Sequence, residues 1–112
     1  MRRKGYIYEK KAKQWLEQRS YRILEENYYS PYGEIDLIAE KEDIIYFIEV
    51  KSSQSSAIPL TYKLSKAKKT NIMNTSLHYI EKNNITRQIS FSLITIQKET
   101  TRYYKHIIDM ET

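Results

Sequence analysis

Two acidic residues and a lysine in the first half of the chain have the types and the spacing of a metal-dependent hydrolytic site. Asp36 stands inside the apolar run EIDLIA, and Glu49 stands inside the apolar run IIYFIEV, with Lys51 two residues later. Carboxylates inside apolar strands are costly unless another group compensates their charge. Mg²⁺ or Mn²⁺ suits this purpose, because both ions prefer carboxylate oxygens.

The two apolar runs predict neighbouring strands that bring these groups together. Strand side chains alternate between faces, so Glu34 and Asp36 share one face of their strand. For the same reason Glu49 and Lys51 share one face of the next strand. A hairpin with a loop of about four residues at 41–44 places Asp36 directly opposite Glu49. A slip of one residue would put the two acids on opposite faces.

Two carboxylates so close repel each other, and a divalent cation between them removes the repulsion. Lys51 would then orient or help to deprotonate a water molecule, or neutralise charge that develops on a phosphorane-like transition state. The alternative is that each acid pairs with a Lys or Arg at a sheet edge, because the pattern D-x₁₂-E-x-K is short. The flanking apolar strands, the hairpin-length gap and the basic helix that follows weaken this alternative without removing it.

Residue periodicity predicts the order helix, three strands, helix, two strands. The expected helices cover residues 6–19 and 61–82, and the expected strands cover residues 21–24 with an extension to 28, then 34–40, 44–51, 88–97 and 102–108, with a hairpin at 98–101. These elements predict an α/β fold in which helices flank a sheet. The second helix is expected to bury Leu64, Ala67, Ile72, Met73, Leu77 and Ile80.

Glu9 falls on or beside the apolar stripe of the first predicted helix, which Ala12 and Leu16 help to form. The plainer interpretation places Glu9 at the edge of this stripe near the helix start, where the helix dipole favours an acid. The alternative is that Glu9 faces inward because it has a function there.

Composition limits the class of protein. The chain has 112 residues and no Cys, which predicts one domain over residues 1–112 and excludes disulfides, thiolate metal sites and cysteine nucleophiles. The basic start MRRKG is not followed by the apolar segment of a signal peptide, and no apolar run approaches the roughly 20 residues that cross a bilayer. We therefore expect a cytoplasmic protein without a membrane partner.

The net charge is +5, and the positive residues concentrate in two segments. They are Arg2, Arg3, Lys4, Lys10, Lys11 and Lys13 near the start, and Lys63, Lys66, Lys68 and Lys69 in the second predicted helix. A phosphate backbone is the common partner of such clusters. The alternative, which charge alone leaves open, is a pair of solvated helix faces.

The segments GEID at 33–36 and FIEVKSS at 47–53 resemble the PD-(D/E)XK nuclease superfamily, and in particular its YraN family of small predicted endonucleases. The similarity covers nearly the whole chain. It begins with Gly5 and Glu9, takes in YRILEENYY at 21–29, and ends with the stretches RQISFSLITI and HIID. GEIDLIA followed by FIEVK at this spacing is rather specific for the family.

This resemblance implies a restriction-endonuclease-like α-β-β-β-α-β core and a Mg²⁺- or Mn²⁺-dependent endonuclease. It would act on DNA, including branched or structured DNA, by attack of a metal-activated water on the backbone phosphate. By matching position, Asp36 and Glu49 would be metal ligands and Lys51 the catalytic lysine. Glu9 would be the helix-borne acid that archaeal Holliday junction resolvases place beside the metal, and Glu34 is a secondary candidate. Because those resolvases are symmetric dimers, the resemblance also suggests a homodimer for this chain.

The chain departs from the family pattern at three positions. Ser53 stands where relatives carry Arg, and Ser90 and Ser92 stand where an Arg-Phe-Asp run is common. These departures motivate the alternative function, a non-catalytic nucleic-acid-binding module with a nuclease fold.

Two further groups have open roles. Lys63, Lys66, Lys68 and Lys69 either contact phosphates near the site or form a solvated face. Tyr28, Tyr29 and Tyr32 either stack on bases or, as the plainer interpretation has it, pack on the sheet edge.

Overall fold

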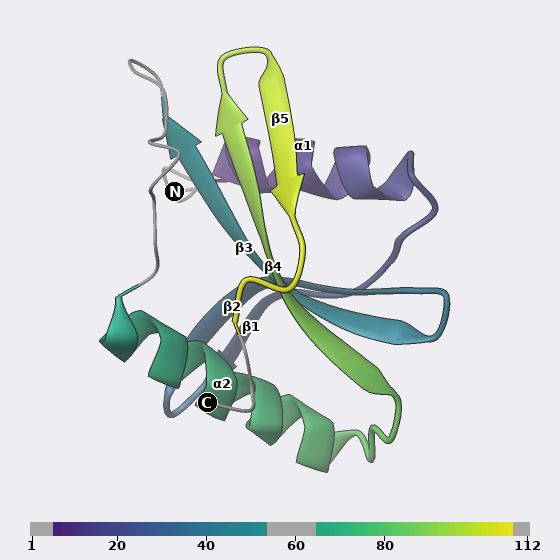
Figure 1. The fold of residues 1–112 in the computed structure, drawn as a ribbon, viewed down its shortest axis with the longest axis vertical. Helices are drawn as coiled ribbons and strands as arrows, with labels where there is room; N and C mark the ends of the chain where they lie inside the picture. The colour runs from purple at the N-terminus through teal and green to yellow at the C-terminus, as the bar shows by residue number, and fades with distance from the viewer. Residues whose placement is uncertain (1–5, 54–64, 109–112) are drawn as a thin grey trace.

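A five-stranded sheet with one helix packed on each face forms the protein in the computed structural model, which describes residues 6–53 and 65–108 (Figure 1). The elements are α1 (Tyr6–Glu17), β1 (Arg22–Ser30), β2 (Gly33–Lys41), β3 (Ile44–Ser53), α2 (Lys66–Lys82), β4 (Gln88–Gln97) and β5 (Thr100–Tyr104). This order confirms the α/β fold and the α-β-β-β-α-β core. Gly5, Lys63 and the expected helix start at 61–64 lie outside the described residues.

The sheet is mixed, with the strands in the order β1-β2-β3-β4-β5. β3 and β4 run parallel and α2 lies between them in the sequence, whereas all other neighbours are antiparallel. The β2–β3 turn consists of Glu42 and Asp43, both with positive φ (51° and 66°). Two such residues form the type I′ turn that matches the twist of a hairpin, so this turn sets the β2–β3 register.

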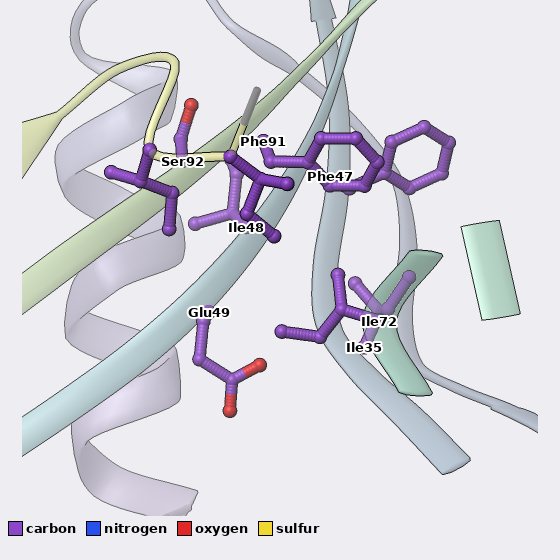
Figure 2. A pocket seen from close by; sticks show the side chains of 9 residues that line it. Ile35, Phe47, Ile48, Glu49, Ile72, Phe91 and Ser92 are labelled. Atoms are coloured by element: carbon purple, nitrogen blue, oxygen red, sulfur yellow. The ribbon is translucent and has the colours of Figure 1, made fainter. Parts of the chain in front are cut away.

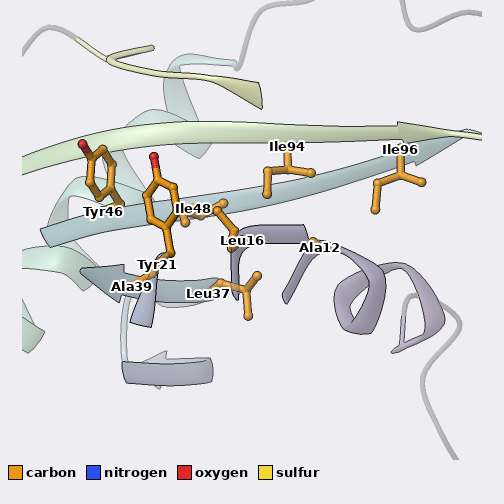
Figure 3. Packing of buried hydrophobic residues seen from close by; sticks show 9 residues of the cluster. All are labelled: Ala12, Leu16, Tyr21, Leu37, Ala39, Tyr46, Ile48, Ile94 and Ile96. Carbon is orange, nitrogen blue, oxygen red and sulfur yellow. The ribbon is translucent and has the colours of Figure 1, made fainter. Parts of the chain in front are cut away.

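Alternation along the strands divides the core into two layers. The layer under α1 contains Ala12 and Leu16 of the helix together with strand residues such as Leu37, Ile48 and Ile94 (Figure 3). The layer under α2 contains Ile35, Ile38, Ile45, Phe47, Ile72, Tyr79, Phe91 and Ile108. Residues that pack on opposite faces have opposite parity along β3 and β4, as a pleated sheet requires.

α1 begins at Tyr6 as predicted but ends at Glu17, two residues before the predicted end. The chain reverses at Ser20, which adopts a left-handed conformation (φ 70°). The amide of Tyr21 donates to the Leu16 carbonyl at 3.0 Å, which closes the helix end.

α2 buries only part of the predicted face: Ile72 is buried, and Met73 and Ile80 pack half-buried against the core, as predicted. Its buried residues are Ile72, Thr75, Ser76 and Tyr79, whereas Ala67 and Leu77 are exposed. The polar members are satisfied, because Thr75 Oγ1 lies 2.9 Å from Ser30 Oγ and Ser76 Oγ donates to the Met73 carbonyl at 2.7 Å. Hydrogen bonding lets hydroxyl side chains occupy a buried face that hydrophobicity alone would not assign to them.

The C-terminal strand is shorter than predicted and begins earlier. β5 covers Thr100–Tyr104 rather than residues 102–108, and the turn consists of Lys98 and Glu99. The chain leaves the sheet through His106, which has positive φ (57°), and the Ile107 amide donates to the Phe91 carbonyl at 2.9 Å. The apolar residues after Tyr104 therefore cover the α2 layer instead of extending β5.

In the part of the chain that the structure describes, neither helix is long and apolar enough to cross a membrane.

Truncation of Leu16 in α1 tests the division of the core into two layers. We expect Leu16→Ala to lower the free energy of unfolding by about 2–5 kcal/mol, because Leu16 is fully buried between α1 and the sheet. Leu77→Ala is the matched control, since Leu77 is also helical but 43% exposed, and it should change stability by less than about 0.5 kcal/mol. Urea unfolding measures both, and equal effects would contradict the assigned layers.

Candidate metal centre

Strands β2 and β3 separate next to Asp36. Their paired residues run from Lys41↔Ile44 to Leu37↔Ile48, which confirms the predicted register over this stretch. Beyond that point the Val50 amide donates to the Asp36 carboxylate (Oδ2) at 2.8 Å. A side-chain oxygen thus satisfies an amide at the place where the strand ladder stops, and this bond holds the Asp36 carboxylate against β3.

β2 is irregular at the same residue. Ile35 belongs to the layer under α2 and Leu37 to the layer under α1, although residues two apart share a face in a regular strand. On the other side, Asn27 of β1 has positive φ (52°), although the β1–β2 register is the same before it (Glu26↔Leu37) and after it (Tyr28↔Ile35). The assumption that Glu34 and Asp36 share a face through simple alternation therefore does not describe this strand.

The irregularity nevertheless brings three carboxylates together. One oxygen from each of Glu9, Glu34 and Asp36 lies within 4.8 Å of the other two, and all three residues are half-buried. Glu9 comes from the first turn of α1, whereas Glu34 and Asp36 come from β2. We refer to these three residues as the acidic cluster. Glu34 is an equal member of it, where the sequence indicated only a secondary position.

Glu49 lies beside this cluster with its side chain against the α2 layer. It lines an apolar pocket with Ile35, Phe47, Ile72 and Phe91 (Figure 2). Only 14% of its side chain is exposed, and Lys68 Nζ lies 3.0 Å from one carboxylate oxygen, Oε1. The other oxygen, Oε2, is buried and has no hydrogen-bond partner among the described residues.

Burial, together with the charges of neighbouring acids, raises the pKa of both Glu49 and Asp36. Burial and then the Asp36 charge raise the pKa of Glu49 to about 7, while Lys68 opposes the shift. Burial also raises the pKa of Asp36; the Val50 amide and Lys68 oppose this, and the Glu34 charge adds to it. Ionised carboxylates in this arrangement are therefore unfavourable without a further positive charge.

The donor set fits a hard divalent cation. Carboxylate oxygens of Glu9, Glu34 and Asp36 converge, and the neighbouring Glu49 Oε2 is buried without a hydrogen-bond partner among the described residues. Mg²⁺ and Mn²⁺ prefer such oxygen ligands, and their charge would favour the ionised carboxylates against the burial and the mutual repulsion that raise the two pKa values. Glu9, Glu34 and Asp36 are the residues whose oxygens would hold the ion, and Glu49, whose charge interacts with that of Asp36, is a further candidate ligand.

The predicted lysines have different environments. Lys51 is exposed near the end of β3, two residues after Glu49, and pairs with Thr95 of β4. Lys66 is exposed and Lys69 half-buried in the first turn of α2. Lys68 forms the ion pair with Glu49, a contact that the sequence analysis missed. Its position four residues before Ile72 was the available signal, because residues four apart share one helix face.

The fold and the site define an α/β protein with a carboxylate centre where two strands of a mixed sheet separate. Residues 8–96 match the family described as "Uncharacterised protein family UPF0102", and the chain belongs to this YraN-like family.

Relatives from different bacteria are similar over nearly the whole chain. A UPF0102 protein of Campylobacter jejuni subsp. jejuni (serotype O:23/36, strain 81-176) is 34% identical over 103 residues, covering 92% of this chain and 91% of its own. One from Sulfurihydrogenibium sp. is 33% identical over 110 residues, with 96% of both chains covered. One from Fervidobacterium nodosum is 35% identical over 104 residues, covering 90% of this chain and 78% of its own.

The raised pKa of Glu49 predicts a pH-dependent stability in EDTA. Glu49 retains its proton in the folded state up to about pH 7 but loses it near 4.5 when unfolded, so stability falls as pH rises through this window. Glu49→Gln lacks the titrating group and therefore lacks this loss. From pH 4.5 to about pH 7, its free energy of unfolding should rise relative to that of wild type by up to roughly 3 kcal/mol. Glu99→Gln, in the exposed β4–β5 turn, is the control. Parallel pH profiles for Glu49→Gln and wild type in urea unfolding would contradict the burial of this carboxyl group.

Proposed function

We propose that this protein is a Mg²⁺- or Mn²⁺-dependent endonuclease that hydrolyses phosphodiester bonds in DNA, with branched or structured DNA among its substrates. The observation that carries the proposal is the convergence of Glu9, Glu34 and Asp36 within 4.8 Å, next to the buried Glu49. The resemblance of GEIDLIA and FIEVK to PD-(D/E)XK nucleases supports the same chemistry.

Each carboxylate has a distinct contribution. Asp36 is held by the Val50 amide, and Glu49 by Lys68, so both present oxygens from fixed positions. Glu9 supplies a third oxygen from α1. When bound, the cation would supply an activated water and stabilise the charge that develops on the phosphate.

Lys51 is the proposed catalytic lysine. Its exposed side chain starts two residues after Glu49 on β3. An ammonium group there orients the attacking water or neutralises the negative charge that accumulates on the phosphate oxygens. Lys66 and Lys69 at the start of α2, together with Lys63, would contact backbone phosphates and bind DNA without reading its sequence.

A second candidate is a nucleic-acid-binding module that keeps the fold and does not cleave. Ser92 favours it, because this residue is 1% exposed and carries no charge where the family pattern has Asp. The two candidates differ in whether the carboxylates bind metal and whether the backbone is cut.

Metal binding is the first discriminating measurement. Mn²⁺ at about 100 times its dissociation constant should stabilise the folded protein by about 2.7 kcal/mol. The apparent affinity should fall as pH drops below about 7, because Glu49 must release its proton. Asp36→Asn should lose the thermal shift, and Asp43→Asn, in the exposed turn at the other end of the same hairpin, should keep it. A shift that survives in Asp36→Asn would place the metal elsewhere.

Cleavage is tested with labelled linear, flapped and four-way DNA in Mg²⁺, Mn²⁺ or EDTA. We expect metal-dependent cutting that Asp36→Asn and Lys51→Ala each reduce by about two orders of magnitude or more, because each removes a group that stabilises the transition state. Asp43→Asn should cut like wild type, which also controls for a contaminating nuclease. Undiminished cutting by Asp36→Asn would refute the site, and salt-sensitive binding by every variant without any cutting would favour the binding module.

A further inference from the structure

The tyrosines near the candidate metal centre fall into two groups. Tyr28 is packed, because its hydroxyl lies 2.7 Å from His78 Nδ1 and its ring meets Tyr79 edge-on at 5.1 Å. Tyr29 and Tyr32, in contrast, are 63% and 53% exposed. The expected packing on the sheet edge therefore holds for Tyr28 and not for these two residues, whose large apolar rings face solvent.

Tyr29 lies next to the acidic cluster. It pairs directly with Glu34 across the β1–β2 hairpin. Directly opposite residues in an antiparallel pair project from the same face, with Cβ atoms about 4.5–5.5 Å apart. Glu34 contributes an oxygen to the cluster. An exposed aromatic ring thus flanks the carboxylates.

Tyr32 extends this aromatic surface on an anchored turn. Its amide donates to Ser30 Oγ at 3.0 Å, and the same hydroxyl oxygen lies 2.9 Å from Thr75 Oγ1 of α2. Gly33 has a positive φ of 144°, which a side chain would strain, and lies close to Asn71 and Thr75 of α2. The turn that carries Tyr32 is therefore tied to α2, which limits the backbone entropy lost when the Tyr32 ring meets a ligand.

We propose that Tyr29 and Tyr32 form a stacking platform for unpaired nucleobases beside the metal centre, so that the substrates are nucleic acids with unpaired nucleotides next to the scissile phosphate. This rests on the proposed action on nucleic acid. Bases inside a duplex are covered by their neighbours, and only an unpaired base offers its face to a tyrosine ring. Two rings at one hairpin tip are too small a patch for a stable protein interface, and the net charge of +5 favours a polyanion.

The test compares binding of the full chain, in EDTA, to fluorescent duplexes with a short flap. One flap carries bases, and the other has the same phosphates with abasic sugars. We expect the flap with bases to bind roughly 5- to 150-fold more tightly, the effect of stacking one base. Tyr29→Leu should remove this preference, and Tyr29→Phe should retain it because Phe keeps the ring. Tyr104→Leu is the control and should retain the preference, since Tyr104 is also exposed (40%) but lies on β5.

Each result has a distinct meaning. Equal binding of the two flaps by wild type, or a preference that persists in Tyr29→Leu, would overturn the platform. If metal-dependent cutting is present at the same time, the proposed function stands and this inference alone fails. A base preference without cutting by wild type keeps the platform and removes the catalytic proposal. Binding to neither flap would overturn both, and thermal unfolding of the Leu and Phe variants verifies that each is folded.

Discussion

The hydrogen bond from the Val50 amide to the Asp36 carboxylate organises the centre of this protein. Neighbouring strands normally satisfy their amides through the ladder, and here one amide is satisfied by a side chain at the point where β2 and β3 separate. The bond favours the ionised form of Asp36, against burial that disfavours it. An acid is thereby held between two layers of the core, where it meets residues from both faces of the sheet.

Each helix contributes a charged side chain to the centre, from its own face of the sheet. α1 packs through Ala12 and Leu16 and so fixes Glu9 near Asp36. α2 packs through Ile72 and Tyr79 and so brings Lys68 to Glu49. The two layers are therefore the scaffold of the centre as well as the source of stability, and the positions of its charges depend on correct packing on both sides.

The electrostatics of the centre are unfavourable for the protein alone. Glu49 has an apolar environment, one oxygen without a donor, and a negative neighbour, and its pKa rises to about 7 as a result. Lys68 compensates only part of this charge. Natural proteins tolerate such local conflicts mainly where a function requires them, which is why the centre, rather than the basic surface, carries the functional proposal.

The sequence by itself determined the elements and the pairing of the central hairpin. The β-branched and aromatic runs predicted β2, β3 and β4 to within a few residues, and the short gap at 41–44 set the register that the structure has. These features are local, because strand propensity, turn length and alternation act over a few residues. Asp36 and Glu49 could be recognised as candidate site residues for the same reason, because each stands inside one of these apolar runs.

The tertiary structure decided the features that depend on packing and on contacts between distant segments, which no local sequence pattern specifies. The buried face of α2 includes Thr75 and Ser76, because a hydrogen bond to Ser30 of β1 satisfies Thr75 and one to the Met73 carbonyl within α2 satisfies Ser76. The irregularity at Asp36 lies between the positive φ of Asn27 in β1 and the Val50 amide in β3 that bonds the Asp36 carboxylate. The ion pair of Lys68 and the exposure of Tyr29 depend on which residues lie opposite once the layers have packed. Contacts between distant segments form only when the whole core is buried, so burial and hydrogen bonding together, and not residue type, placed these groups.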